Sequence, residues 1–174
     1  MITSTSSSWL AGCTAAAAAA ALAGCGGEEA QAQTAEFDPC RALTPQILAM
    51  HGWDAQPPDP RQPTVGAVTW KGCRYVARAG YGLVIETTNG TLAQVRQTFP
   101  RAVDISIGDR RALRYEARPD VPGGCTINVE MRSGSLYILS DVPQTPTNIA
   151  QGLEACASAT DIAEKVVPLL PIGS

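Results

Sequence analysis

Residues 125–142 read CTINVEMRSGSLYILSDV, and this stretch decides the fold. Apolar and polar residues alternate over residues 125–131, which predicts a strand with one buried face. The buried face carries Cys125, Ile127, Val129 and Met131, and the solvent face carries Thr126, Asn128 and Glu130. Residues 132–135 predict a turn, and residues 136–142 predict the returning strand. The stretch therefore predicts an antiparallel hairpin that turns Cys125 toward the core.

Further strands and helices flank this hairpin. Strands are predicted at residues 69–78, 82–88, 103–107 and 111–117, and a helix is predicted at residues 91–99. An earlier helix begins at Pro45, with Thr44 as its N-cap and Gly52 at its end. The mixed order of helices and hairpins predicts one α+β domain, with a mostly antiparallel sheet and packed helices.

A helical stripe with spacings of three and four residues lies near the C-terminus. Its members are Ile149, Leu153, Cys156, Thr160, Ala163, Val167 and Leu170. Pro168 interrupts the helix late, because proline lacks the amide hydrogen that a helix interior needs. The stripe places Cys156 on the side of the helix that faces the core.

The front of the chain is uncharged, and residues 9–25 read WLAGCTAAAAAAALAGC. The apolar run is shorter than the ~20 residues that span a bilayer, and it is typical of an export signal. It ends in LAGC, which resembles the lipobox of bacterial lipoproteins, whose cysteine becomes the lipidated first residue. We expect a lipoprotein signal peptide at residues 1–24, and a lipidated Cys25 with a flexible tether at residues 25–36. A plain cleaved signal or an alanine-rich helix is the alternative.

The chain holds six cysteines, of which we expect Cys13 to be lost with the signal and Cys25 to carry the lipid. Four remain in the domain of residues 37–171, namely Cys40, Cys73, Cys125 and Cys156. The sequence has no Cys-x-x-Cys pair, the spacing typical of zinc sites. Export to an oxidising compartment favours disulfides. Four cysteines allow three pairings. Cys125 and Cys156 both face the core, so we expect them to pair, which leaves Cys40 with Cys73.

Four short segments together resemble a known family. They are Phe37-Asp38-Pro39-Cys40, Gly72-Cys73-Arg74-Tyr75, Gly124-Cys125 and Cys156. With the lipobox, they are similar to the actinobacterial exported lipoproteins with a domain of unknown function, which include the mycobacterial lipoproteins LprB and LprC. The resemblance covers residues 37–170. It implies a place in the cell envelope and two disulfides within the domain, and it implies no catalytic residues.

Composition argues against several function classes. The net charge is −3 and aromatic residues make up 5% of the chain, so a nucleic-acid partner is not expected. The single histidine, His51, lies in the last turn of the first predicted helix, where the helix dipole favours its charged form. A serine-nucleophile elbow and a phosphate-binding glycine loop are both missing from the sequence. Glu86, Glu116 and Glu130 are predicted on solvated strand faces, so no catalytic, metal or cofactor site is predicted.

Two groups of residues are candidates for binding. Arg110, Arg111, Arg114 and Arg118 form the densest positive cluster, and Arg110, Arg114 and Arg118 share one strand face. This face binds an anionic ligand or a lipid headgroup in one interpretation, and is a solvated face of mixed charge in the other. Trp53, in the proline-rich loop of residues 52–64, either lines a ligand surface with Tyr81 and residues 119–124 or covers the edge of the core.

We therefore expect a non-enzymatic protein that is lipid-anchored on the extracytoplasmic face of the cell membrane. Its partner is expected to be a small ligand or an envelope protein. The alternatives are an envelope hydrolase that uses carboxylates, and a sensor or regulatory subunit of a membrane protein. A concave pocket with two carboxyl groups favours the hydrolase.

Overall fold

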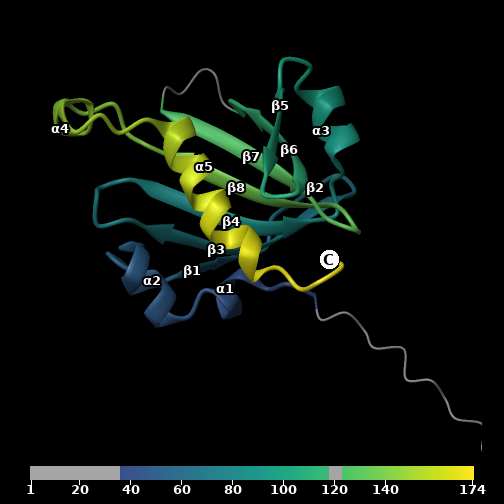
Figure 1. The fold of residues 1–174 in the computed structure, drawn as a ribbon, viewed down its shortest axis with the longest axis horizontal. Coiled ribbons are helices and arrows are strands. Elements are labelled where there is room, and N and C mark those ends of the chain that lie inside the picture. The colour runs from purple at the N-terminus through teal and green to yellow at the C-terminus, as the bar shows by residue number, and fades with distance from the viewer. Residues whose placement is uncertain (1–35, 118–122) are drawn as a thin grey trace, which may run out of the picture. The chain divides into compact units, whose positions relative to one another are not determined.

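Eight strands form one sheet in the part of the chain that the computed structural model describes, residues 36–117 and 123–174 (Figure 1). The strands are β1 (Asp59–Arg61), β2 (Thr64–Val65), β3 (Val68–Val76), β4 (Gly82–Thr88), β5 (Val103–Ile107), β6 (Arg110–Tyr115), β7 (Gly124–Glu130) and β8 (Ser135–Asp141). Their order is β1-β3-β4-β8-β7-β6-β5, and β2 pairs with β3 outside this path. All these strand pairs are antiparallel. The predicted α+β class with an antiparallel sheet is confirmed.

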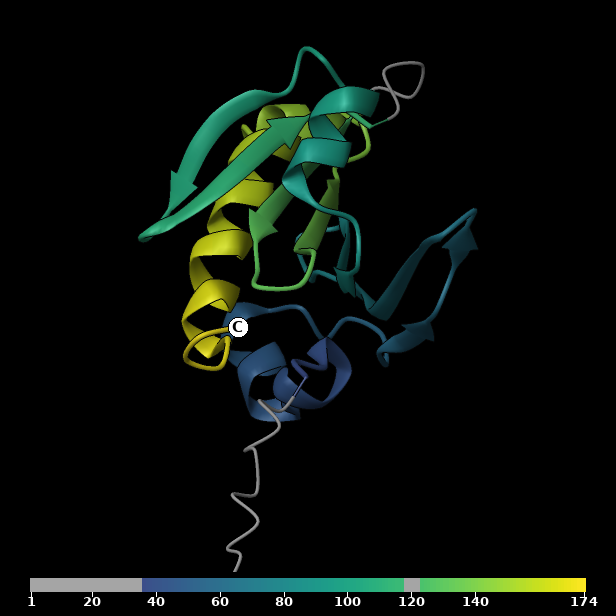
Figure 2. The same ribbon diagram turned by 90° about the vertical axis from the view of Figure 1, so that its right-hand side faces the viewer.

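Helices lie on both faces of this sheet. They are α1 (Pro39–Ala42), α2 (Pro45–His51), α3 (Leu92–Thr98), α4 (Pro146–Ala150), α5 (Ala155–Val166) and the 3-10 turn η1 (Val167–Leu169). Figure 2 shows α5, in yellow, on one side of the sheet and α3 on the other. We call the side that α5 covers the inner face, and the side that carries α3 the outer face.

The capping signals in the sequence locate α2 and α3. The Thr44 side chain accepts a hydrogen bond from the amide of Ile47, and Gly52 ends α2 in the left-handed conformation with φ 68°. Thr91 caps α3 and forms a reciprocal capping box with Gln94. These side chains satisfy amide groups that the first turn of a helix leaves without partners. Both predicted helices are therefore confirmed.

Both predicted disulfides are present and fasten helices to the inner face. Cys40 of α1 is bonded to Cys73 of β3, with their Cα atoms 5.3 Å apart. Cys125 of β7 is bonded to Cys156 of α5, with a Cα separation of 5.0 Å. Around them lies the main core, whose largest fully buried side chains include Trp53, Tyr75, Leu43, Leu83, Ile85, Ile127, Leu136, Ile138 and Ile162. The two covalent links thus hold α1 and α5 against the sheet.

The predicted C-terminal stripe is wrong in its first part. Gly152 has φ 65° and separates α4 from α5, so residues 149–170 do not form one helix. Ile149, at the start of the predicted stripe, is 62% exposed. The face of α5 that packs on the sheet carries Ala159, Ile162, Ala163 and Val166. Cys156 still reaches the inner face, as its disulfide requires.

Two further expectations fail for reasons of tertiary packing. Thr126 and Asn128 of β7 are buried and not solvent-facing, because β7 is a central strand and α3 covers its outer face. Residues 52–64 are predicted as a loop, yet they contain β1 and the start of β2. Pro60 sits within β1, a place proline tolerates only at the edge of a sheet.

Candidate functional site

A row of directly paired residues crosses the outer face of the sheet. Arg61 pairs with Gly72, Gly72 with Glu86, and Glu86 with Tyr137 of β8. Paired residues in antiparallel strands direct their side chains to the same face. Because Gly72 has no side chain, Arg61 and Glu86 approach each other across β3. The row therefore brings one positive and one negative group together beside a tyrosine.

Glu86 is the unusual member of this row. Glu86 is 3% exposed, and its Oε1 atom lies 3.6 Å from Nε of Arg61. That separation is too long for a hydrogen bond. No group among the described residues donates a hydrogen bond to this buried oxygen. Burial raises the pKa of Glu86, and the nearby Arg61 partly offsets the effect.

Glu86 lies in a pocket on the outer face, with a volume of about 310 Å³. The pocket is lined by Arg61, Pro63, Val65, Trp70, Val84, Glu86, Phe99, Tyr115, Ala117, Tyr137 and Leu139, and we call it the outer-face pocket. Four of these residues are aromatic, and five are aliphatic residues or proline. A mostly apolar wall with a few polar groups is typical of small-molecule sites.

A chain of hydrogen bonds fixes one wall of the outer-face pocket. Tyr115 Oη donates to Asn128 Oδ1 at 2.8 Å. Asn128 Nδ2 donates to Ser135 Oγ at 2.7 Å, and Ser135 donates in turn to the carbonyl of Gly90. The ring of Tyr115 also stacks on Phe99, with the ring centroids 4.3 Å apart. Buried and satisfied networks of this kind rigidify their surroundings, so the pocket wall is preformed.

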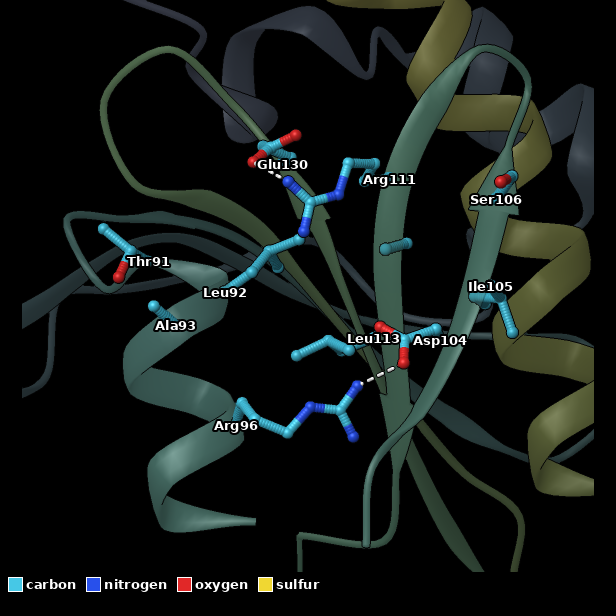
Figure 3. A pocket seen from close by; sticks show the side chains of 11 residues that line it. Thr91, Leu92, Ala93, Arg96, Asp104, Ile105, Ser106, Arg111, Leu113 and Glu130 are labelled. Carbon is cyan, nitrogen blue, oxygen red and sulfur yellow. Dashed lines mark hydrogen bonds and ion pairs between the residues drawn. The ribbon is translucent and has the colours of Figure 1, made fainter. Parts of the chain in front are cut away.

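A larger hollow of about 870 Å³ lies between α3 and the β5–β6 hairpin (Figure 3). Its charged side chains are already paired with one another. Arg96 contacts Asp104 at 2.7 Å, and Arg111 contacts Glu130 at 3.4 Å. Asp104 is 82% exposed, so solvent screens its pair. The hollow is larger than the outer-face pocket but holds no comparable unpartnered buried group, and the outer-face pocket is the better candidate.

Comparison with known proteins places the chain in a family. Residues 8–169 match the model of a family described as "Protein of unknown function (DUF3558)". The chain belongs to the DUF3558 family. No curated protein and no solved structure matches it.

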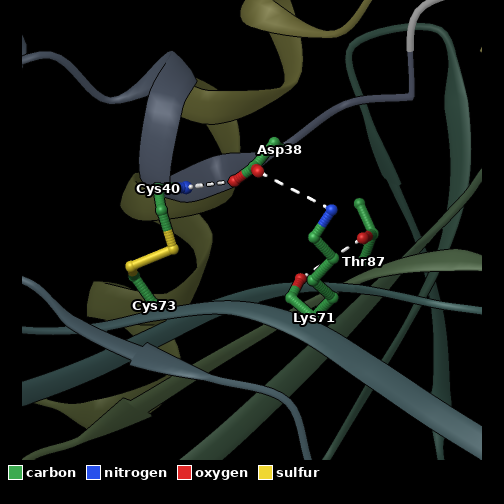
Figure 4. A network of polar contacts seen from close by, with 5 residues as sticks. All are labelled: Asp38, Cys40, Lys71, Cys73 and Thr87. Carbon is green, nitrogen blue, oxygen red and sulfur yellow. Dashed lines mark hydrogen bonds and ion pairs between the residues drawn. A yellow bond between two sulfur atoms is a disulfide. The ribbon is translucent and has the colours of Figure 1, made fainter.

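The segments around the first two cysteines of the domain are held together by a set of contacts that we call the clasp (Figure 4). Asp38 Oδ1 accepts a hydrogen bond from the amide of Cys40 at 3.0 Å, and Asp38 Oδ2 lies 3.7 Å from Nζ of Lys71. Thr87 Oγ1 donates to the carbonyl of Lys71 at 3.3 Å. With the disulfide between Cys40 and Cys73, these contacts hold the start of the domain against β3. These contacts give the Asp-Pro-Cys segment a structural role.

The aromatic candidates from the sequence lie in the inner-face core of the DUF3558 domain. Trp53 is 1% exposed and Tyr81 is 9% exposed. Trp53 packs near His51, with ring centroids 4.8 Å apart, and Lys165 Nζ lies 5.9 Å from the Trp53 ring. Neither Trp53 nor Tyr81 lines the outer-face pocket, and their burial favours the packing interpretation. Residues 119–122 lie outside the described part of the chain.

The arginine candidates are only partly brought together. Arg110 and Arg114 share one face of β6, with the buried Ala112 between them. Arg110 donates to the carbonyls of Glu130 and Ser174, at 3.2 and 2.8 Å. Its guanidinium is therefore engaged with backbone oxygens. Arg118 lies outside the described residues, as does Cys25.

One prediction about a titratable group is wrong, and for a second the surroundings act against the expected effect. Glu86 is buried and not solvated, because β3 and β8 enclose β4 on both sides and four aromatic residues line the same pocket. Burial lowers the pKa of His51, and Lys165 lowers it further, while Asp161 raises it by a smaller amount. These effects oppose the charged form that the helix dipole favours. The residues of the outer-face pocket were missed, although Gly72 inside a predicted strand is a sign of close approach.

Among residues 36–117 and 123–174, no helix is long and apolar enough to cross a membrane. The same residues contain no group of three or more His, Cys, Asp or Glu side chains that could hold a metal ion.

Proposed function

We propose that this DUF3558 protein is a lipid-anchored, extracytoplasmic binding protein of the cell envelope, related to the actinobacterial lipoproteins that its sequence resembles. The LAGC segment after the apolar run of residues 9–21 supports the anchor. The two disulfides support an oxidising compartment, where such bonds persist. The anchor is expected at Cys25, outside the described residues.

The outer-face pocket is the proposed binding site for a small ligand. The observation that carries this proposal is the buried Oε1 atom of Glu86, which has no hydrogen-bond donor among the described residues. A buried polar group without a partner costs about 1–3 kcal/mol. A group with this cost at the floor of an apolar pocket is a sign of function rather than of stability.

Binding is favoured over catalysis at this site. Among the described residues, Glu86 is the one carboxyl group that lines the outer-face pocket. A carboxylate-dependent hydrolase needs a second acidic group to act as base or nucleophile. The neighbouring charged group is Arg61, which stays positive and cannot take a proton at neutral pH. The proposed role is therefore a binding module, since the part of the chain that the structure describes offers no second carboxyl group to the pocket.

The anchor is tested with two cysteine substitutions in the same segment. Cys25→Ala should move the protein from the membrane fraction to the soluble exported fraction and abolish incorporation of labelled fatty acid. Cys13→Ala is the matched control, and it should leave both readouts unchanged. Membrane retention and lipid labelling in the Cys25→Ala variant would overturn the lipoprotein proposal.

The pocket is tested with Nile red, a neutral dye that fluoresces in apolar sites. The purified full chain should bind it at one site. Ala117→Phe should abolish this binding, because Ala117 lines the outer-face pocket and the larger ring fills it. Ala157→Phe, at an exposed position on α5 outside the outer-face pocket, is the matched control. Equal dye binding by the two variants would exclude the outer-face pocket as the site.

A further inference from the structure

We propose that the ligand of the outer-face pocket carries a protonated amine on an apolar body, and that the Glu86 carboxylate binds this amine. The inference rests on the proposed binding function of the pocket and adds the chemical class of the ligand. Its basis is the geometry of Glu86, the aromatic walls and the position of Arg61.

The Glu86 carboxylate is a hydrogen-bond acceptor, and no described residue donates a hydrogen bond to its Oε1 atom. An ionised carboxylate accepts hydrogen bonds and donates none. Its side chain is 4% exposed, so water has little access to it. Strands β3 and β8 flank β4, and their backbone groups are used in pairing with it. A ligand with N–H groups would provide the missing donor, and a charged donor makes the stronger bond.

The aromatic walls favour a cation over an anion. Trp70, Tyr115 and Tyr137 line the pocket around Glu86, together with Phe99. The faces of such rings carry partial negative charge and attract ammonium groups within about 6 Å. A ligand carboxylate would instead lie among these rings beside the Glu86 charge, and the Arg61 cation that would attract it is 42% exposed. The pocket chemistry therefore matches an organic amine.

Arg61 is placed to give way to such a ligand. Its side chain is 42% exposed, and its Nε lies 3.6 Å from Glu86 Oε1. Because Arg61 is this exposed and makes no hydrogen bond to Glu86, its hold on the carboxyl group is weak. Arg61 ends β1, a strand of three residues at the edge of the sheet. Its guanidinium can turn into solvent when an ammonium group reaches Glu86, so the pair does not block the site.

Three probes of one shape test the inference by displacing Nile red from the purified full chain. They are phenethylamine, phenethyl alcohol and hydrocinnamate, which carry an ammonium, a hydroxyl and a carboxylate on the same ring and chain. Phenethylamine should displace the dye at a concentration about tenfold lower than phenethyl alcohol requires. Hydrocinnamate should be the weakest of the three.

Glu86→Gln should remove the preference for the amine and keep the binding of Nile red, since that dye has no N–H donor. Glu130→Gln is the matched control, because the Glu130 side chain also lies on the outer face of the sheet but pairs with Arg111. Equal displacement by the amine and the alcohol, or an amine preference that survives in Glu86→Gln, would overturn the inference while the binding function stands. Failure of Nile red to bind the unaltered chain would instead overturn the binding function itself.

Discussion

Gly72 and Glu86 are direct partners across β3 and β4, and the missing side chain of Gly72 provides the space in which the Glu86 side chain lies. A β-carbon on Gly72 would stand 2.7 Å from the Cα atom of Glu86 and 3.0 Å from its Cγ atom, and it would also overlap the carbonyl of Ile85. Glycine normally weakens a strand interior. Here it allows a buried carboxyl group and the Arg61 side chain to meet.

The first prediction concerns this contact. Gly72→Ala should lower the free energy of unfolding by about 2 kcal/mol or more, because the overlapping atoms belong to the backbone and cannot move aside cheaply. Gly82→Ala on the neighbouring strand is the control, since its β-carbon would meet no atom closer than 3.5 Å. Urea unfolding of both variants measures the difference. Equal stability of the two would show that Gly72 has no steric role.

The second prediction concerns the pH dependence that Glu86 introduces. Burial raises its pKa above the ordinary 4.5, so the folded protein holds this proton more tightly than the unfolded chain does. The stabilising contribution of the protonated group is complete below the ordinary pKa and is lost as the pH rises through the raised value. Arg61 opposes this loss, and Tyr137 faces the same carboxyl from β8.

Glu86→Gln should therefore match the unaltered protein in acid and exceed its stability at neutral pH by about 1 kcal/mol, the low end of the cost of an unpartnered buried polar group. Chemical unfolding at several pH values checks this. Glu130→Gln is the control and should show no such gain at neutral pH. A Glu86→Gln variant that loses stability at neutral pH would mean that the ion pair with Arg61 outweighs burial.

The sequence predicts those features of the fold that depend on neighbouring residues. Thr44 and Gly52 act within one or two turns of chain, and the boundaries of α2 follow from them. The pairing of Cys125 with Cys156 follows from which way a strand and a helix face. These signals are local, so the pattern of residues is sufficient to read them.

The candidate site depends on contacts between segments that are far apart in the sequence, and local patterns of residues do not specify these contacts. Glu86 occupies a polar position of its strand by alternation, and its burial follows from the placement of β8 beside β4. The pairing of β4 with β8 joins residues about fifty positions apart, and no local pattern encodes it. Arg61 lies in a proline-rich segment that reads as a loop. The pocket therefore becomes visible once the strand order is known.

The third prediction concerns the disulfides, which close loops of similar length, 33 and 31 residues. Replacing either pair with alanine should lower the free energy of unfolding by about 3–4 kcal/mol in the chain-entropy model. The two replacements should differ in the region where amide exchange increases. Loss of Cys40–Cys73 should raise amide exchange throughout the four-residue α1, whereas loss of Cys125–Cys156 should affect the first turn of α5 and spare the buried region around Ile162 and Val166. Uniform exchange changes in both variants would contradict this division.

The last prediction concerns the hydrogen-bond chain under α3. Burial raises the pKa of Tyr115, so its hydroxyl stays protonated and remains the donor to Asn128. Tyr115→Phe leaves the buried Asn128 oxygen without that donor, and Ser135→Ala removes the next link. Each change should cost about 1–2 kcal/mol. Because Asn128 connects the two sites, their combined cost should differ from the sum by at least ~0.5 kcal/mol. The control pair is Tyr115→Phe with Thr160→Ala, on α5 across the sheet, and urea titrations should show that these two costs add. Additive costs in both pairs would show that the hydrogen-bond chain does not act as a unit.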